Sequence, residues 1–357
     1  MNFTLYPIYW AAQQFDGERF DMGRLPFDIA EGVRIESVRD RFDDGSFDIW
    51  RERIGGEALD ALRAVRLALV HRYDPRQIVV DGELLGHVPH ELQSDRRVRL
   101  LAICLRLIRP MRQRVAVIHG RIREPEGCFD VAGFDVPPTE MIEVPEVQKL
   151  FKLRDRDADD LRAYAPGFLR AVQGGFWKFK MAVEFYELGY FHSLAWKARY
   201  LLWCSAIESI FTSHHWEHQG SLVATARIRW FLGENTNIYA PGDLSDLLED
   251  PGLTVGRLVD DMYLMRNYLA HGDRIPDLFY LDVLRQGFGG GVVKPEVLLE
   301  LASFVARSSI LKILRDDLLE HFAGADQAEA YFGAQGLTRS RLRPARNNPP
   351  AAARPGA

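Results

Sequence analysis

The sequence predicts a protein of α+β class that is mainly α-helical, with a mixed N-terminal domain before a helical C-terminal domain. Residues 1–145 alternate short β-type runs with helical patterns, whereas residues 146–336 repeat helical patterns throughout. Four prolines interrupt the stretch Glu124–Pro145, which separates the two halves. At 357 residues, the chain fits two domains better than one. We therefore expect domains at 1–145 and 146–336, followed by a tail at 337–357.

The N-terminal half predicts a mixture of strands and helices. Asp28–Val38 places β-type residues around a glycine and predicts a strand or hairpin. Gly56–His71 has Leu and Val at helical steps, which favours an amphipathic helix. Gln77–Val88 predicts two strands joined by an Asp-Gly turn, and Arg97–Met111 predicts a helix with a buried face. Glu124–Pro145 predicts a loop-rich connection, so the domain boundary is placed near its end.

The C-terminal half predicts six helices separated by loops. They are Asp157–Gln173, Trp177–Leu188, Ser193–Phe211, Ser221–Leu232, Thr254–Ala270 and Lys294–Phe322. The third is apolar nearly all round, which predicts a central position in the bundle. Thr254 suits an N-cap and Gly272 follows the end of the fifth helix, where a glycine commonly stops one. Asn235–Pro251 predicts a polar loop.

Composition argues against several classes of function. The formal net charge is −5, so a globally basic nucleic-acid footprint is absent and any RNA contact has to be a local patch. Cys104, Cys128 and Cys204 are far apart and form no CxxC pair, which favours reduced thiols over a disulfide framework or zinc ribbon. The first residues resemble no signal peptide and no apolar run is long enough for a membrane span. We expect a cytoplasmic protein without a membrane segment.

The last 21 residues, Leu337–Ala357, contain five arginines, four prolines and no acidic residue. This composition predicts a disordered basic tail. The tail could contact RNA or an acidic partner, but a solubilising extension is the preferred interpretation.

The segment Asp261–Arg274 (DMYLMRNYLAHGDR) is the strongest candidate for a functional site. Its apolar positions share one helical face, and Arg266 and Asn267 fall outside that face. Arg266 and His271 point about 140° apart in an ideal helix. Because Gly272 should end the helix, His271 could swing back towards Arg266. A helix C-terminus also favours a protonated imidazole.

These residue types suit RNA cleavage without a metal ion. Such a reaction needs an acid and a base at the ribose 2′-OH and the leaving oxygen, and a cation on the phosphate. His271 suits the acid/base role, Arg266 a bidentate phosphate contact, and Asn267 the orientation of either one. The other interpretation is an exposed helix end with a capping histidine, and spacing alone favours neither.

The R-x4-H spacing occurs twice more, at Arg66–His71 and Arg114–His119. Both intervening stretches are purely apolar, so we interpret these residues as ordinary edge residues of a helix and a strand. Only Arg266 is followed by a polar residue in a helix that ends in His-Gly.

The segment Tyr263–Gly272 resembles the R-x4–6-H signature of the HEPN superfamily. The context is similar to its Apea-like branch, with an Ala-Ile-Glu-Ser-Ile-Phe pattern at Ala206–Phe211 and an Arg-bearing helix at Ala226–Arg229. The resemblance covers roughly residues 155–322. It implies a helical bundle that dimerises, so that two Arg/His sets face each other across a cleft. Many HEPN proteins are metal-independent endoribonucleases in toxin or phage-defence settings, and others are inactive sensors or scaffolds.

The sequence thus predicts a metal-independent endoribonuclease that acts as a homodimer on RNA, with Arg266, His271 and Asn267 in the site. Glu208 is expected inside the bundle, paired with Arg227 or Arg266, because a buried carboxylate needs a partner. Tyr263 is expected beside the site. The alternative is a non-catalytic HEPN module that binds RNA, a nucleotide or a protein. Residues 1–145 could recruit a partner protein.

No cofactor and no metal are expected. His214 and His218 are four residues apart, a spacing that suits a metal on a helix, and His215 lies between them. No third ligand at a suitable spacing is evident, so metal binding is the minor interpretation. The run Gly289–Gly291 lacks the Lys and Ser/Thr of a P-loop and predicts a plain hinge.

Overall fold

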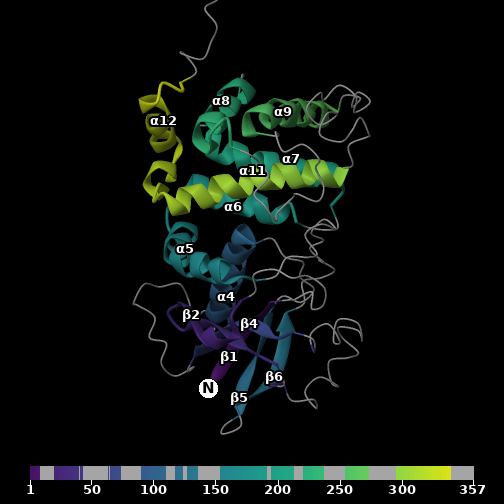
Figure 1. The fold of residues 1–357 in the computed structure, drawn as a ribbon, viewed down its shortest axis with the longest axis vertical. Helices are drawn as coiled ribbons and strands as arrows, with labels where there is room; N and C mark the ends of the chain where they lie inside the picture. The colour runs from purple at the N-terminus through teal and green to yellow at the C-terminus, as the bar shows by residue number, and fades with distance from the viewer. Residues whose placement is uncertain are drawn as a thin grey trace, which may run out of the picture.

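The structure is a computed structural model. It describes residues 1–8, 20–39, 41–42, 63, 65–73, 90–109, 117–123, 127–135, 153–190, 194–212, 220–236, 254–272 and 295–338. These residues form eight α-helices and one six-stranded antiparallel sheet, so the expected α+β class is confirmed. Figure 1 shows the sheet at one end of an elongated molecule and most of the helices at the other.

All neighbouring strands of the sheet run antiparallel, in the order β2-β3-β4-β1-β5-β6. Their bounds in that order are Phe27–Ala30, Val33–Ser37, Leu67–Tyr73, Asn2–Ile8, Val117–Arg123 and Cys128–Asp135. The first two form the hairpin predicted over Asp28–Val38, with Gly32 in the turn at φ 71°. Glycine suits that turn because side chains disfavour positive φ.

Two stretches that were predicted otherwise are strands. The helix predicted over Gly56–His71 is wrong for its described C-terminal part, because Leu67–Tyr73 is β4, between β1 and β3. Its first four residues are buried, and a short apolar run of this kind suits a buried strand as well as a helix. The loop predicted over Glu124–Pro145 contains β6, which pairs with β5 and has Phe129 and Val131 buried.

Helix α4 (His90–Ile108), close to the predicted Arg97–Met111, packs on β1, β4 and β5 and connects the sheet to the helices. It also contacts α5 (Asp155–Gln173) and α11 (Pro295–Arg315). One continuous hydrophobic core therefore runs from the sheet into the bundle. Figure 1 shows α4 between the sheet and the other helices.

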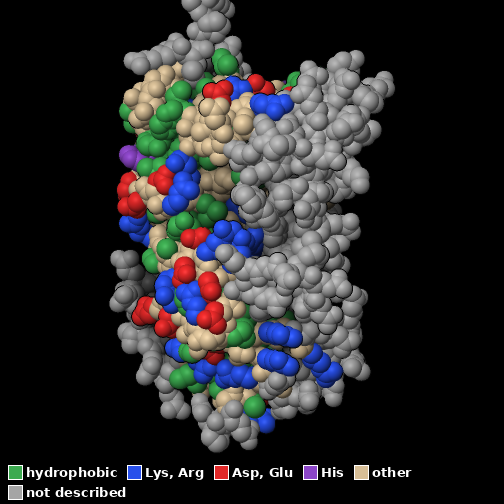
Figure 2. Space-filling view, viewed as in Figure 1, with side chains coloured by type: hydrophobic (Ala, Val, Ile, Leu, Met, Phe, Trp, Pro, Cys, Tyr) green, Lys and Arg blue, Asp and Glu red, His purple; other side chains and the backbone are tan. Residues whose placement is uncertain are grey.

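Charged residues also join the sheet to α5. Arg24, just before β2, lies 2.9 Å from a carboxylate oxygen of Asp155 and 2.5 Å from one of Asp159. Figure 2 shows acidic and basic side chains interleaved at this level of the molecule. Because such exposed pairs contribute little stability, we attribute the packing of α5 mainly to its buried apolar residues.

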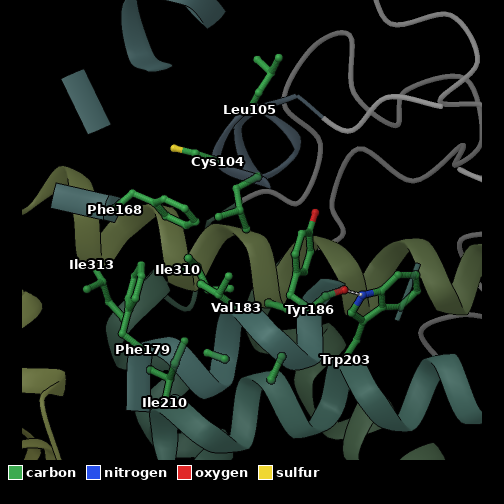
Figure 3. Close-up of a cluster of buried hydrophobic side chains, with 14 of the residues drawn as sticks. Cys104, Leu105, Phe168, Phe179, Val183, Tyr186, Trp203, Ile210, Ile310 and Ile313 are labelled. Atoms are coloured by element: carbon green, nitrogen blue, oxygen red, sulfur yellow. Dashed lines mark hydrogen bonds between the residues drawn. The ribbon is translucent and has the colours of Figure 1, made fainter. Parts of the chain in front are cut away.

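The remaining helices form the bundle largely as predicted. They are α6 (Trp177–Leu188), α7 (Trp196–Phe211), α8 (Gly220–Leu232) and α9 (Val255–His271), together with α5 and α11. The apolar α7 packs against α6, α8, α9 and α11, so its predicted central position is confirmed. Figure 3 shows Ile210 and Trp203 of α7 in this core, facing side chains of α6 and α11.

The single long helix predicted over Lys294–Phe322 is wrong at its C-terminal end. Helix α11 stops at Arg315, and Leu319–Phe322 forms a separate 3-10 turn. Asp317 adopts φ 51°, a left-handed conformation that cannot continue a right-handed helix. A further helix, α12 (Ala325–Ala334), was not predicted from the sequence.

Several predictions lie outside the described residues. These are the strands over Gln77–Val88, nearly all of the loop over Asn235–Pro251, the domain boundary near Pro145, and the tail from residue 339 onward. In the described residues, no helix combines the length and apolar character that a membrane crossing requires.

Candidate functional site

Helix α9 positions the candidate site, and local sequence sets both of its ends. The Thr254 hydroxyl oxygen accepts a hydrogen bond from the Arg257 backbone N–H at 3.4 Å, which confirms the predicted N-cap. Gly272 adopts φ 70° and ψ 17° at the C-terminal end, as predicted. The buried face of α9 consists of Val255, Leu258, Val259, Met262, Tyr263 and Met265.

Arg266 is held against α7 by Glu208. Its Nη2 lies 3.0 Å from Oε1 and 3.1 Å from Oε2 of that carboxylate. Its Nη1 donates a longer hydrogen bond, at 3.4 Å, to Oδ1 of Asn267. The side chains of Arg266 and Glu208 are 29% and 25% exposed, so the pair lies at the surface of the bundle. The guanidinium is thereby oriented and remains accessible to an anion from outside.

The pairing predicted for Glu208 is confirmed with Arg266, but the predicted environment is wrong. Glu208 is one quarter exposed, at the edge of the bundle where α7 packs against α9. Arg227, the other expected partner, pairs with Glu329 instead.

Arg227 is a fully buried residue with partners from three parts of the chain. Its Nη1 donates to the Phe211 carbonyl at 2.8 Å and its Nε to the Leu337 carbonyl at 3.1 Å. Its Nη2 lies 2.6 Å from the carboxylate of Glu329 on α12. The contacts fasten α12 and the segment after it to α7 and α8. Glu329 was missed from the sequence because α12 itself was not predicted.

Tyr263 lies beside Arg266 with its hydroxyl enclosed in the protein. The residue is 4% exposed, and the hydroxyl has no hydrogen-bond partner in the part of the chain that the structure describes. Burial raises the pKa of Tyr263 well above its ordinary value, and the negative charge of Glu208 adds to the increase. Cys204, one turn before Glu208 on α7, also lies near this hydroxyl; the four-residue spacing could have indicated it.

His271 is the last residue of α9 and is exposed. Among the described residues, no hydrogen bond or ion pair joins its ring to Arg266, Asn267 or any other side chain. The structure therefore brings together Arg266, Asn267, Glu208 and Tyr263, and it does not bring His271 into this group. The expected swing of His271 towards Arg266 stays a prediction, since no hydrogen bond among the described residues joins the two side chains.

The two other R-x4-H matches end in a different environment. His71 lies in β4 and His119 in β5, and both pair in register with Thr4 of β1. His71 Nδ1 is 2.7 Å from the Ser94 hydroxyl, which donates to the Thr4 hydroxyl at 2.8 Å. Burial lowers the pKa of His71 to about 4, and the positive charge of Arg97 contributes. Both histidines are strand residues inside a sheet, unlike His271 at a helix end.

The remaining sequence candidates give no site in the described part of the chain. His214, His215, His218 and Gly289–Gly291 lie outside the described residues. Among the residues that are described, no group of three or more His, Cys, Asp or Glu side chains is arranged to hold a metal ion.

Comparison with known protein families, with characterised proteins and with solved structures finds no match.

Proposed function

We propose that the chain is a HEPN-type endoribonuclease that cleaves RNA without a metal ion, in a toxin or phage-defence setting. The observation that supports the proposal most is the Glu208–Arg266 pair. The carboxylate of Glu208 orients the partly exposed guanidinium of Arg266. The exposed His271 lies less than two turns further along the same helix, at its end. The sequence resemblance between Tyr263–Gly272 and the HEPN signature is the second support.

Each residue has a role that follows from its chemistry. Arg266 binds the scissile phosphate, because guanidinium matches phosphate oxygens in a bidentate manner. His271 transfers protons at the ribose 2′-OH or the leaving oxygen. Asn267 orients Arg266 through its amide oxygen, and Glu208 is a positioning residue that fixes the guanidinium from the α7 side.

A second copy of the chain completes the proposed site. Arg266 and His271 lie about 140° apart around an ideal helix, so one chain does not readily present both to one phosphate. Leu264, Asn267 and His271 share one side of α9, and Leu264 is 40% exposed. A partner placed against this side would cover Leu264 and bring its own residues close to Arg266 and His271. The homodimer predicted through residues 155–322 would have this geometry.

The experiment is an RNA cleavage assay with the purified full chain in EDTA. Wild type should leave 2′,3′-cyclic phosphate ends, because the 2′-OH is the nucleophile a metal-free site activates. His271→Ala and Arg266→Ala should each lower the rate by about 10²–10⁴-fold, the range for loss of an acid/base or charge-stabilising group. His71→Ala and His119→Ala control for the spacing. Arg229→Ala is the matched control for Arg266, since Arg229 forms a similar ion pair with Asp260 between α8 and α9.

Cleavage that survives His271→Ala unchanged would remove the site assignment. Sedimentation of wild type as a 40.8 kDa monomer at micromolar concentration would count against the composite site.

The alternative function is a non-catalytic HEPN module that binds RNA, a nucleotide or a protein partner. The separation of His271 from the Arg266 group favours it, because an acid/base catalyst has to reach the same phosphate as the cation. Binding of RNA that is weakened by Arg266→Ala, with no cleavage by the wild-type dimer, would support this alternative.

A further inference from the structure

Glu36 on β3 is a buried carboxylate surrounded by three arginines. Its side chain is 5% exposed. Arg72 of β4 donates to both of its oxygens, from Nε to Oε1 at 3.0 Å and from Nη2 to Oε2. The Nη1 of Arg41 donates to Oε2 at 3.1 Å, and the Nε of Arg34 lies 3.8 Å from Oε1. One negative charge therefore lies among three positive charges.

Two of these arginines have a structural role that explains their positions. Arg72 already gives Glu36 a bidentate partner, which is what a buried carboxylate requires. Arg41 joins the residues after β3 to the start of β6, because its Nε and Nη2 donate to the Gly127 carbonyl at 3.2 and 2.7 Å. Its guanidinium also lies over the ring of Phe129, 4.6 Å from the centroid. The third arginine is needed for neither task.

Arg34 has no equivalent structural role. Among the described residues its guanidinium makes no hydrogen bond, and its side chain is 40% exposed. Besides Glu36, its ion-pair partner is Asp28, whose Oδ1 is 3.6 Å from the Nε of Arg34. Asp28 is 80% exposed, so solvent screens this pair strongly. The N–H groups of Arg34 are thus available to a ligand that approaches from solvent.

Arg34 and Arg72 are neighbours on the face of the sheet opposite α4. Arg34 pairs in register with Val70, and Arg72 is two residues further along β4, so all three side chains point to the same face. Val70 belongs to a small apolar cluster on that face, whereas Leu69 belongs to the core that includes α4. Diagonal neighbours of this kind lie about 7–8 Å apart, so both guanidiniums can contact one extended anion.

This part of the sheet has an excess of positive charge. Residues 27–39, 41–42 and 65–73 contain five arginines and three acidic residues, although the whole chain carries a net charge of −5. One of the three acidic residues, Glu31, lies 3.7 Å from Arg97 of α4. Figure 2 shows basic side chains predominating over acidic ones at the level of the sheet, on the face in view. Like charges at short range repel each other, and a bound anion would relieve this repulsion.

We propose that Arg34, Arg41 and Arg72 bind the phosphate backbone of RNA on the sheet, as a contact separate from the Arg266 site. Their side chains are 40%, 29% and 27% exposed, and Glu36 holds them together. A polyanion binds such solvated cations through several contacts and the release of counterions, whereas a small ion needs an enclosing site. The inference rests on the proposed function for its ligand, RNA, and does not depend on cleavage.

The test is the binding of a fluorescent, 2′-O-methylated oligouridylate to the full chain, measured by anisotropy at a series of salt concentrations. The methyl groups block the nucleophile, so the proposed nuclease cannot cleave the probe. Arg34→Gln should weaken binding about threefold to tenfold and lower the slope of log affinity against log salt by about 0.7, the value for one phosphate contact on a single strand. Arg34→Lys should keep the wild-type slope, because it keeps the charge.

Arg24→Gln is the matched control. Arg24 is 28% exposed and lies close to the carboxylates of Asp155 and Asp159, so its surroundings are negative rather than positive. Its affinity and salt slope should be those of wild type. Thermal unfolding without RNA shows whether each variant folds. Arg34→Gln should melt at the wild-type temperature or above, since it removes a like charge and no hydrogen bond among the described residues.

Wild-type affinity and salt slope in Arg34→Gln would overturn the proposal, as would a wild-type chain that does not bind the oligonucleotide. Inorganic phosphate that binds wild type as tightly as the oligonucleotide does, and no longer binds Arg34→Gln, would assign the cluster to a small anion instead.

The cleavage assay separates this inference from the proposed function. Cleavage that is lost in Arg266→Ala, together with unchanged oligonucleotide binding in Arg34→Gln, refutes the sheet contact and leaves the nuclease proposal standing. Oligonucleotide binding that depends on Arg34, without cleavage of RNA by wild type, refutes the nuclease proposal and supports the sheet contact.

Discussion

Two arginines of the bundle differ in how many of their hydrogen-bond donors have partners within the protein. Arg227 is fully buried and donates to two carbonyls and a carboxylate, which together join α7, α8 and α12. Arg266 is 29% exposed and is held from one side by Glu208. The first arrangement fixes the fold and leaves no room for a ligand. The second orients a cation towards solvent, which is what a binding site for an anion requires.

The histidines show the same contrast. His71 is half-buried in β4, bonds to Ser94 and stacks on Tyr73 with ring centroids 5.6 Å apart. His271 is exposed at the end of α9 and has no such partner among the described residues. Each ends an R-x4-H match, so spacing alone does not separate a structural histidine from a functional candidate. The surroundings of the residue separate them.

The largest expected effect on stability belongs to Arg227. Arg227→Met should lower the free energy of unfolding by about 3–5 kcal/mol, because it leaves the Glu329 carboxylate and two carbonyls without their donor. Arg266→Met should cost less than about 1 kcal/mol, as for other partly exposed ion pairs. Urea unfolding followed by circular dichroism measures both. Similar losses in the two variants would contradict the distinction between them.

The next effect is a dependence on acid that originates at His71. Its pKa is lowered to about 4 in the folded protein, so the unfolded chain takes up a proton first as the pH falls. Stability should be complete above the ordinary histidine pKa and should decrease as the pH falls from about 6.5 to about 4. Allowing for partial exposure, the loss is on the order of 1–2 kcal/mol.

His71→Gln should reduce this acid sensitivity, because glutamine can keep a hydrogen bond to Ser94 and does not titrate. His119→Gln, on the neighbouring strand, is the control for replacing a strand histidine by glutamine. Urea unfolding at a series of pH values between 4 and about 7 tests both. An unchanged profile in His71→Gln would place the acid sensitivity elsewhere.

Local sequence signals predicted the bundle better than the sheet. Helix α6 has the predicted bounds Trp177–Leu188, because helical periodicity and Gly189 fix a helix within one continuous segment. The capping residues Thr254 and Gly272 likewise predicted where α9 begins and ends, because they too are local signals. Strand β4 was predicted as helix because its identity depends on pairing with β1, far away in the sequence.

Within the candidate site, the Glu208–Arg266 pair could be predicted because a carboxylate on an apolar helix needs a partner. The sequence could not show that Arg227 pairs with another carboxylate, because its partner Glu329 lies 102 residues further along the chain. The position of His271 relative to Arg266 depends on how the C-terminal end of α9 is built and, under the proposed function, on a second copy of the chain. Neither is encoded in the spacing.

A smaller effect should distinguish two neighbouring tyrosines. The Tyr263 hydroxyl is buried without a partner in the described residues, so Tyr263→Phe should be neutral or stabilise the protein by about 1 kcal/mol. The Tyr200 hydroxyl donates to the Met262 carbonyl at 2.9 Å, so Tyr200→Phe should cost about 1 kcal/mol. Thermal or urea unfolding should therefore show a loss of stability only in Tyr200→Phe. A clear loss in Tyr263→Phe would mean that its hydroxyl has a partner in solution.

The smallest effect on stability and the most informative one for function is expected at Glu208. Because both side chains are about one quarter exposed, a double-mutant cycle of Glu208→Gln and Arg266→Gln should give a coupling of about 0.2–1 kcal/mol. The same cycle with Asp260→Asn and Arg229→Gln is the control, since that pair also joins two helices at the surface. Its coupling should be similar, and neither Asp260→Asn nor Arg229→Gln should alter RNA cleavage or binding.

Glu208→Gln should weaken RNA cleavage or RNA binding, because Arg266 keeps its charge and loses the carboxylate that orients it. If Glu208→Gln changes neither stability nor activity, the pair does not form in solution, and the distinction drawn between Arg266 and Arg227 would rest on exposure alone.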